Sequence, residues 1–511
     1  MSNVTSVQMG VQDALWLTMD RPNNLMVVDG AMVLGKQVDL EQVRAVYEHA
    51  LGRFPVFQRK AVPAGMGWVW QDDPYFSIDR HLSEATLPQP ADMRALQQFL
   101  ADQRTAPLPK DRPLWRAYLI EEMNLADGTV GSAIVNRFHH AIADGVRLTQ
   151  VMLGLCELDE SAKPVTVAKP PAEQGPLDLV AGLAGTARST AGAATRFLGK
   201  AGVGAASDIA HAVTHPMETV SGLPGKAVGA PGAVLHGVED GVELLRHPDH
   251  LLDAMDVMGV EASRGANDMS SVTKLALTSS AKTVWTGKPG TKKAISWSEP
   301  IPLSLVKEVG RATGATVNDV LLSAVAGGLR NYLLERDAYV PEINWMVPVN
   351  LKPFADNLPP DLGNYFAIVI LPMPLDDDKP RDRLATMHHR MDRIKHSDEA
   401  VLTFGIQRVV SMSPGPVAFS LTNFFANKAV GVLTNVPGPR GEMTFAGAPV
   451  RQVVGFAPCS GDQPMTATIF SYNGEVTVGF ATDAGLIPDP EALADLVVAS
   501  IDELAEAVGV G

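Results

Sequence analysis

The sequence predicts an α/β protein of two domains, and three observations lead to this class. Segments with the 3.6-residue period of amphipathic helices alternate with short runs rich in β-branched and apolar residues, which are typical of strands. The chain has 511 residues, more than one hydrophobic core usually organises. Asn473-Gly474 separates two alternating runs, residues 466–472 and 475–482, which indicates a hairpin. Sheets covered by helices are therefore expected.

The first half contains helices and strands in alternation. Asp39 is the expected N-cap of the first helix, and a turn with the sequence Ala126-Asp127-Gly128 joins the two longest strands. In chain order we expect a helix at residues 39–51, strands at 56–61 and 68–71, a helix at 92–104, and strands at 114–121 and 129–138.

The most informative segment is Phe138-His139-His140-Ala141-Ile142-Ala143-Asp144-Gly145, between a half-buried strand and an amphipathic helix expected at residues 145–158. A histidine with an ordinary pKa of about 6.5 can take a proton from a hydroxyl and return it to a leaving group. Asp144 either fixes the histidine tautomer or holds the loop, and it also lies where a helix N-cap belongs. Gly145 would permit a backbone conformation that other residues resist.

Other segments extend this motif to a family. HHxxxDG resembles the active-site signature of the acyltransferase superfamily that includes chloramphenicol acetyltransferase and peptide-synthetase condensation domains. Pro113-Leu114-Trp115, Asn318-Asp319 and Asn435-Val436-Pro437-Gly438-Pro439 match the PLW, ND and NVPGP motifs of one branch. With the segments at residues 13–30 and 79–90, the chain resembles the wax ester synthase/diacylglycerol acyltransferase family.

The resemblance implies two chloramphenicol acetyltransferase-like domains, each a mixed sheet with packed helices, and an active-site channel at their interface. We expect an N-terminal half at residues 1–165 with HHxxxDG, and a C-terminal half at 291–511 with the ND and NVPGP motifs. Residues 166–290 are rich in Ala and Gly and form the expected helical connector. It is either a linker that covers part of the fold or a lipid-docking segment.

The second half again alternates helices and strands. We expect strands at residues 293–297, 345–349 and 365–371, a helix from Pro302, and helices at 316–334, 382–395 and 401–410. The apolar segment at 417–426 contains Phe419, Phe424 and Phe425, which either line an acyl tunnel or belong to the core. His388-His389 lacks a following Asp-Gly and is expected on a solvated helix face.

The ND and NVPGP motifs supply further candidates. Asp319 in a first helical turn suits the helix dipole, whereas an amide such as that of Asn318 can stabilise an oxyanion. Two prolines and a glycine predict that the backbone leaves the sheet after Val432-Leu433 in a stiff turn. Asn435, Asp319 and Trp115 are candidate substrate-binding residues. For Trp115 and the NVPGP loop, a packing role is the alternative.

Composition excludes several classes. A net charge of −15 and a pI near 5.3 argue against a nucleic-acid partner. The two cysteines, Cys156 and Cys459, lack CxxC spacing, so neither a disulfide framework nor a metal site is expected. GxSxG, Walker A, GxGxxG and HExxH motifs are missing. We find no signal peptide and no apolar run long enough to span a membrane, so a cytoplasmic protein is expected. It could still associate peripherally with membranes or lipid droplets.

The expected activity is transfer of a fatty acyl group from acyl-coenzyme A to diacylglycerol, forming triacylglycerol, or to a long-chain fatty alcohol, forming wax ester. His140 acts as general base in a ternary complex. His139 shapes the turn, and acyl-coenzyme A is a co-substrate rather than a cofactor. Two alternatives remain: a condensation-type acyltransferase that uses a carrier protein, and a noncatalytic protein that binds lipid droplets.

Overall fold

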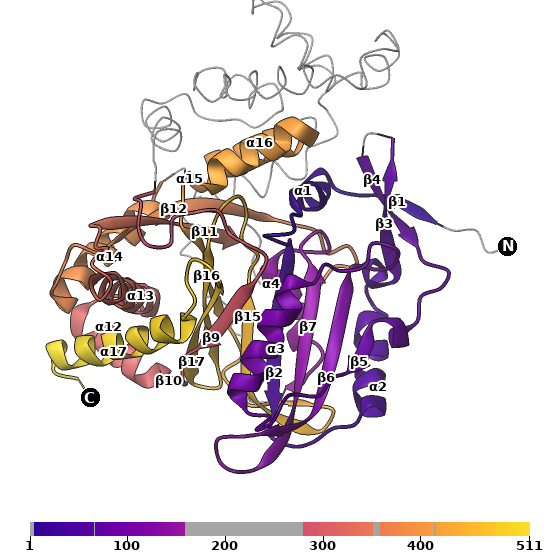
Figure 1. The fold of residues 1–511 in the computed structure, drawn as a ribbon, viewed down its shortest axis with the longest axis horizontal. Helices are drawn as coiled ribbons and strands as arrows, with labels where there is room; N and C mark the ends of the chain where they lie inside the picture. The colour runs from indigo at the N-terminus through magenta and orange to yellow at the C-terminus, as the bar shows by residue number, and fades with distance from the viewer. Residues whose placement is uncertain are drawn as a thin grey trace, which may run out of the picture.

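A computed structural model describes residues 5–65, 67–158, 280–350, 358–397, 399–412 and 415–510. The described chain is α/β, as predicted, and two seven-stranded sheets form its centre (Figure 1). The connector expected at 166–290 lies outside the described residues except for its last part, residues 280–290.

The first sheet carries the histidine motif. Its strand order is β5 (Leu82–Glu84), β6 (Trp115–Asn124), β7 (Val130–His139), β2 (Val27–Leu34), β15 (Ala448–Phe456), β14 (Met443–Phe445) and β8 (Glu157–Leu158). Strand β7 is central and is buried along almost its whole length, not half-buried as expected, because both of its faces are covered.

Helices cover both faces of this sheet. On one face α2 (Leu40–Leu51) and α4 (Gly145–Leu153) pack into one core. On the other, α3 (Met93–Thr105) packs between this sheet and β9 (Lys293–Trp297). Asp39, Asp92 and Asp144 accept backbone hydrogen bonds as N-caps of the three helices. Helix α4 ends earlier than predicted, at Leu153, because β8 joins the sheet.

A small sheet flanks the first half, in the order β1 (Ser6–Gln8), β4 (Gly67–Asp72) and β3 (Arg59–Ala64). The strand expected from residue 56 begins only at Arg59, because Pro55–Gln58 form a short 3-10 helix with a proline in its first turn. A second 3-10 helix spans Ile78–Arg80.

The second sheet has the order β10 (Ile301–Pro302), β17 (Glu475–Asp483), β16 (Met465–Tyr472), β13 (Gly431–Pro437), β11 (Glu342–Asn350) and β12 (Phe366–Pro374), and β9 also pairs with β17. The predicted hairpin is confirmed: Asn473 and Gly474 both have positive φ and join β16 to β17. Neighbouring residues of β11 face different cores, since Trp345 and Met346 belong to separate clusters.

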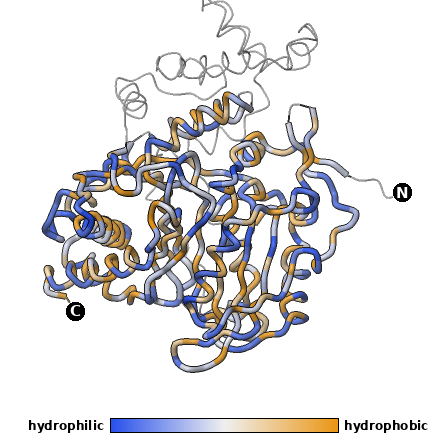
Figure 2. The backbone as a smooth tube through the Cα atoms, viewed as in Figure 1, coloured by the Kyte–Doolittle hydropathy of each residue, from blue (hydrophilic) through white to orange (hydrophobic). Residues whose placement is uncertain are grey.

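Two groups of helices cover the second sheet. Helices α12 (Leu303–Thr313), α13 (Val317–Leu334), α14 (Pro380–Lys395) and α17 (Pro490–Val508) pack with one face. Apolar residues dominate α13 in Figure 2. Helices α15 (Glu399–Met412) and α16 (Gly415–Ala426) lie on the other face beside α1 (Val11–Met19) from the start of the chain (Figure 1).

The two sheets do not divide the chain where the predicted domain boundaries do. Strands β14 and β15, at residues 443–456, lie within the segment assigned to the C-terminal half, yet they belong to the first sheet. Strand β15 pairs with β2 along Leu34 to Asp29. The C-terminal half therefore completes the N-terminal sheet.

The expectation that the chain leaves the sheet after Leu433 is wrong. Strand β13 continues through Asn435 and Val436 to Pro437, in parallel pairing with β16. The N–H of Gly438 donates to the Ser471 carbonyl, so the nitrogen of Pro437 faces away from β16. Strand β11 pairs with β13 only at Gly431 and Val432, and the proline nitrogen thus lies on an unpaired edge.

Among the described residues, no helix combines the length and apolar character needed to cross a bilayer.

Candidate active site

His140 lies just beyond the end of β7, where the first sheet meets the second half of the chain. Its backbone N–H donates to the carbonyl of Met26, the residue directly before the adjacent strand β2 (2.8 Å). Its ring stacks on Trp16 of α1, with centroids 4.0 Å apart, and the Phe366 ring of β12 lies 5.7 Å away. Three separate elements therefore fix the position of this imidazole.

The surroundings keep His140 uncharged at neutral pH. Burial lowers its pKa to about 4, and the neighbouring His139 acts in the same direction. Its own carbonyl oxygen and the side chain of Asn364 oppose this effect. A neutral imidazole has a lone pair that can accept a proton, as a general base requires.

Asp144 holds the loop rather than the histidine. Its Oδ1 accepts from the N–H of Arg147 (3.0 Å), which makes it the N-cap of α4, and its Oδ2 accepts from the N–H of Tyr365 (3.0 Å). Its own N–H donates to the Gly363 carbonyl (3.3 Å). The carboxylate therefore joins the motif to the loop before β12, the partner that sequence could not name. Burial raises its pKa.

The structure places His139 inside the turn of the motif and Gly145 on the wall of a cavity. His139 Nδ1 accepts from the Ala141 N–H (3.1 Å) inside the turn, and its Nε2 is 3.9 Å from Asp20. Burial lowers its pKa to about 4. Gly145 does not have the special backbone conformation we expected, because its φ is not positive. A Cβ there would meet no atom within 4 Å, and the residue lines a cavity.

The ND and NVPGP motifs meet in space, although they are far apart in sequence. The Nδ2 of Asn435 donates to the Oδ1 of Asn318 (2.8 Å), and Asn435 lines the same cavity as His140. Asp319 accepts from the Thr316 N–H (2.9 Å) as part of a capping box, and it contacts His388 Nδ1 at 2.7 Å. His388 is expected on a solvated face. In the structure its side chain is half-exposed and is paired with Asp319.

Trp115 lies in the core of the first half. Its exposed fraction is 1%, its Nε1 donates to the Phe57 carbonyl (2.9 Å), and its ring stacks on His81. It lines neither of the two cavities described below, so its position fits the packing alternative. Of the three phenylalanines in α16, Phe425 lines a cavity, whereas Phe419 and Phe424 lie beside Arg21 and Lys428.

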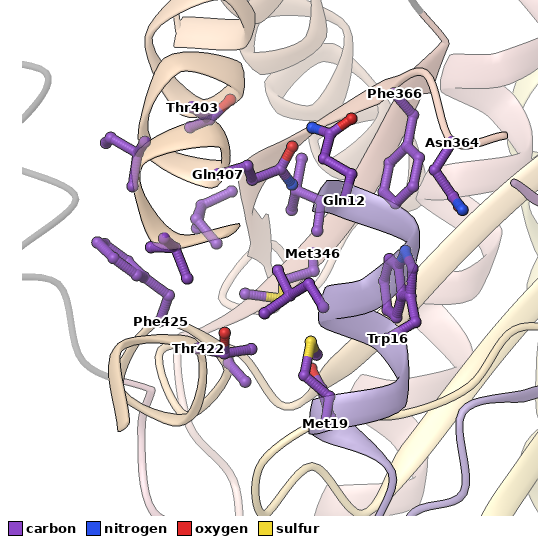
Figure 3. Close-up of a pocket in the computed structure, with 17 residues that line it drawn as sticks. Gln12, Trp16, Met19, Met346, Asn364, Phe366, Thr403, Gln407, Thr422 and Phe425 are labelled. Carbon is purple, nitrogen blue, oxygen red and sulfur yellow. The ribbon is translucent and has the colours of Figure 1, made fainter. Parts of the chain in front are cut away.

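Two apolar cavities meet beside His140. The larger has a volume of about 1410 Å³, which includes its opening to solvent. It lies between the two sheets, and its lining includes His140, Asp144, Gly145 and Asn435. The smaller, about 860 Å³, lies between α1, β12, α15 and α16, and Figure 3 shows Thr403 and Gln407 across it from Trp16. Both cavities share these lining residues: Trp16, Met346, Phe366, Ile368 and Ser460.

Sequence reasoning missed three residues of this site: Asp13, Trp16 and Asn364. The Oδ1 of Asp13 accepts from both the N–H (3.1 Å) and the Nδ2 (2.8 Å) of Asn364, and Asn364 Nδ2 also donates to the His140 carbonyl (2.9 Å). Asp13 lay in a segment that carried the family resemblance, but no local pattern marks Asn364. Within the described part of the chain, no cluster of residues is suited to hold a metal ion.

A histidine at the junction of two mixed sheets, facing a channel made by both halves, defines the chloramphenicol acetyltransferase-like class of acyltransferase folds. The comparisons then identify the family. Residues 9–321 match the wax ester synthase/diacylglycerol acyltransferase catalytic domain, and residues 362–505 match the corresponding C-terminal domain. The chain belongs to the wax ester synthase/diacylglycerol acyltransferase family.

Named relatives and solved structures agree with this assignment. A probable diacylglycerol O-acyltransferase of Mycobacterium tuberculosis is 25% identical over 431 residues, covering 83% of this chain and 78% of the relative. The wax ester synthase/diacylglycerol acyltransferase from Marinobacter aquaeolei VT8 has a similar fold, with a TM-score of 0.63 at 18% identity over 99% and 100% of the two chains. A condensation domain of the CDA synthetase is more distant, with a TM-score of 0.52 at 13% identity over 99% and 98%.

Proposed function

We propose that this chain transfers a fatty acyl group from acyl-coenzyme A to the hydroxyl of diacylglycerol, of a long-chain fatty alcohol, or of both. One observation carries the proposal: a buried, neutral His140 lies where two large apolar cavities meet between the halves of the molecule. Family membership and the names of the relatives support the same substrates.

In the proposed mechanism His140 is the general base. Its Nε2 takes the hydroxyl proton while the acceptor oxygen attacks the thioester carbonyl, and the carbon–sulfur bond then breaks. The imidazolium returns the proton to the departing thiolate, so the products are an ester and free coenzyme A. Because thiolate is a good leaving group, no acyl-enzyme is needed and both substrates bind together. General-base catalysis of this kind contributes about 10²- to 10⁴-fold.

The cavities suit two lipid substrates. The apolar residues that line both cavities are Trp16, Met346, Phe366 and Ile368. They lie beside the imidazole of His140, the proposed general base. Two long chains can thus approach His140 from different directions, which favours a ternary complex. Asn435 is the motif amide that lines the larger cavity, and Asn318 reaches it through Asn435. We propose that this pair contacts the polar part of a substrate near the developing oxyanion.

We propose that the reaction needs no cofactor and that acyl-coenzyme A enters as a co-substrate. Both lipids partition into membranes or droplets, so we propose that the protein works in the cytoplasm at such a surface. Flotation with phosphatidylglycerol vesicles that contain diacylglycerol tests this proposal. Protein that stays in the lower fractions, apart from the floated vesicles, at all salt concentrations would contradict it.

The activity is tested by release of coenzyme A from palmitoyl-coenzyme A. Release should require an added acceptor, and a panel of diacylglycerol, monoacylglycerol and hexadecanol shows which is preferred. His140→Ala should abolish release, whereas His49→Ala, at an exposed histidine of α2, should not. Equal turnover by His140→Ala and the unmodified chain would refute the assignment of the base.

A further inference from the structure

A short loop of the second half, Gly363-Asn364-Tyr365, is held by two carboxylates of the first half. Asp13 accepts from the backbone N–H of Asn364, and Asp144 accepts from the backbone N–H of Tyr365. Successive amides of one loop are thus bound by an acidic residue of α1 and by the acidic residue of the histidine motif. The loop is fixed immediately beside His140.

The side chain of Asn364 has only one orientation that satisfies its contacts. One nitrogen, Nδ2, lies 2.8 Å from the Asp13 carboxylate and 2.9 Å from the His140 carbonyl, and both partners are acceptors. The nitrogen must therefore occupy this position, and Oδ1 must point elsewhere. Asn364 is 5% exposed, so its Oδ1 has little access to water.

Each of these two adjoining residues, His140 and Asn364, has one buried side-chain atom without a standard hydrogen bond. Among the described residues, neither Oδ1 of Asn364 nor Nδ1 of His140 has a partner within hydrogen-bond geometry. The two side chains nevertheless interact in the direction that favours a proton on the ring, as does the carbonyl of His140 itself. A histidine's own carbonyl can reach only Nδ1. Both oxygens therefore favour hydrogen on Nδ1 and a free lone pair on Nε2.

The carboxylate of the motif cannot have this role. Both oxygens of Asp144 are engaged by the backbone of Arg147 and Tyr365. A base generally needs a further group that orients it, and the side chain from another element that interacts with the His140 ring in this direction is the amide of Asn364.

We propose that Asn364, held in place by Asp13, is the positioning residue that sets the tautomer of His140 and leaves Nε2 to take the hydroxyl proton. This inference rests on the proposed function, because it assumes that His140 is the base. Asp13 acts through Asn364 and touches no reacting atom. Trp16, on the same helix as Asp13, stacks on the His140 ring and helps to fix its orientation.

The first experiment compares kinetic constants. Asn364→Leu removes both the donor and the acceptor at nearly constant volume, and kcat should fall about 10²-fold with little change in KM for acyl-coenzyme A. Asp13→Ala should lower kcat less. Asp13→Asn should restore most of that loss, because one oxygen of Asp13 accepts both bonds and an amide keeps one oxygen.

The matched control is Asn24→Leu. Asn24 is also buried and also joins the two halves, by donating to the carbonyls of Gly461 (3.0 Å) and Gln463 (3.3 Å), but it lines neither cavity. This variant should lower the melting temperature without the fall in kcat. An equal fall in kcat in Asn24→Leu would mean that any lost bridge between the halves has the same effect, and would overturn the proposal.

The second experiment reads the tautomer directly. In protein labelled with ¹⁵N-histidine, the signal missing from His140→Ala assigns His140, which should show a protonated Nδ1 and an unprotonated Nε2 at neutral pH. Asn364→Leu should shift this signal towards a mixture of tautomers. A proton on Nε2 in the unmodified chain, or full kcat in Asn364→Leu, would overturn the inference while an inactive His140→Ala left the proposed function intact. An active His140→Ala would remove both.

Discussion

The His140 imidazole is enclosed by Trp16, Phe366 and the loop that contains Asn364. Such a site disfavours the charged ring, since few water molecules or counter-charges can stabilise it. Asp20, the carboxylate paired with Lys110, lies near His139 rather than near His140. The basicity of the site is therefore set by burial.

This burial predicts an unusual pH dependence. Protonation of His140 would remove the proposed base, and because its pKa is lowered to about 4, kcat/KM should stay level from neutral pH to about pH 5 and decline below that. Initial rates with palmitoyl-coenzyme A between pH 4 and 8, with circular dichroism to confirm folding, measure this. A decline centred near pH 6.5, the value for a solvated histidine, would contradict the buried environment.

Asp13 predicts a change in stability. Loss of hydration around its half-buried carboxylate raises the pKa of Asp13 to about 6, above its unfolded value of 3.8. The contribution of Asp13 to the free energy of unfolding is therefore fully present below pH 3.8, where the carboxyl is protonated in both states. It is lost as the pH rises through 6, because the folded state must then ionise an unfavourably placed group. Asp13→Asn lacks this loss. Relative to the unmodified chain it should gain about 1–3 kcal/mol between pH 4 and pH 8 in urea unfolding. A difference that does not vary with pH would contradict the raised pKa.

At the level of elements, the first turn of α4 lies at the site and makes contacts on two sides. Its N-cap, Asp144, binds the loop of the second half, and its first residue, Gly145, faces the larger cavity. Strand β13 approaches from the opposite side and brings Asn435 to the same cavity. The motif residues are thus the ends of elements whose remaining residues form the core.

Gly145 provides a test of cavity space. Because its φ is ordinary and a Cβ meets nothing within 4 Å, Gly145→Ala should fold normally and gain up to about 1 kcal/mol from reduced freedom of the unfolded chain. Gly145→Leu should also fold, but its side chain should enter the cavity and raise KM for long-chain substrates more than for short ones. Chemical denaturation and a chain-length series measure the two effects. A strongly destabilised Gly145→Ala would instead support a backbone requirement for glycine.

On the scale of the whole molecule, the two halves are not independent. Strand β15 is an interior strand of the first sheet, and it comes from residues 448–456. Arg104 of α3 donates to the Ala457 carbonyl directly after that strand, and it also pairs with the fully buried Asp29 (2.7 Å). The halves therefore share a sheet as well as a site.

This shared sheet predicts the behaviour of fragments. Residues 1–158 alone would leave the edge of β2 unpaired along six residues, Asp29 to Leu34, and an exposed apolar edge favours aggregation. The fragment should be insoluble when produced alone, and it should be rescued by co-production with residues 280–511. A soluble fragment 1–158 with native-like circular dichroism would show that β15 is dispensable.

Sequence alone identified the elements whose residues follow a strong local rule. Asp39 and Asp92 are N-caps with their side chains free to bind the next turn, and Asn473-Gly474 tolerates positive φ, so these boundaries follow from local chemistry. Trp115 and the NVPGP segment were harder, because a motif letter does not state which side of a strand is paired or which face is buried. His140 stood out because its chemistry is encoded within one turn.

The sequence by itself determined the class of fold and the family, and it supplied the histidine that we propose as the general base. Only the tertiary structure decided what holds that histidine. Asp13 and Asn364 are hydrogen-bonded although they are 351 residues apart, Asp144 comes from a third segment of the chain, and no local rule links the three. They meet because the second half packs against the end of β7 and places the 363–365 loop between α1 and α4. Hydrogen bonds depend on positions in space, and the fold of both halves together sets those positions.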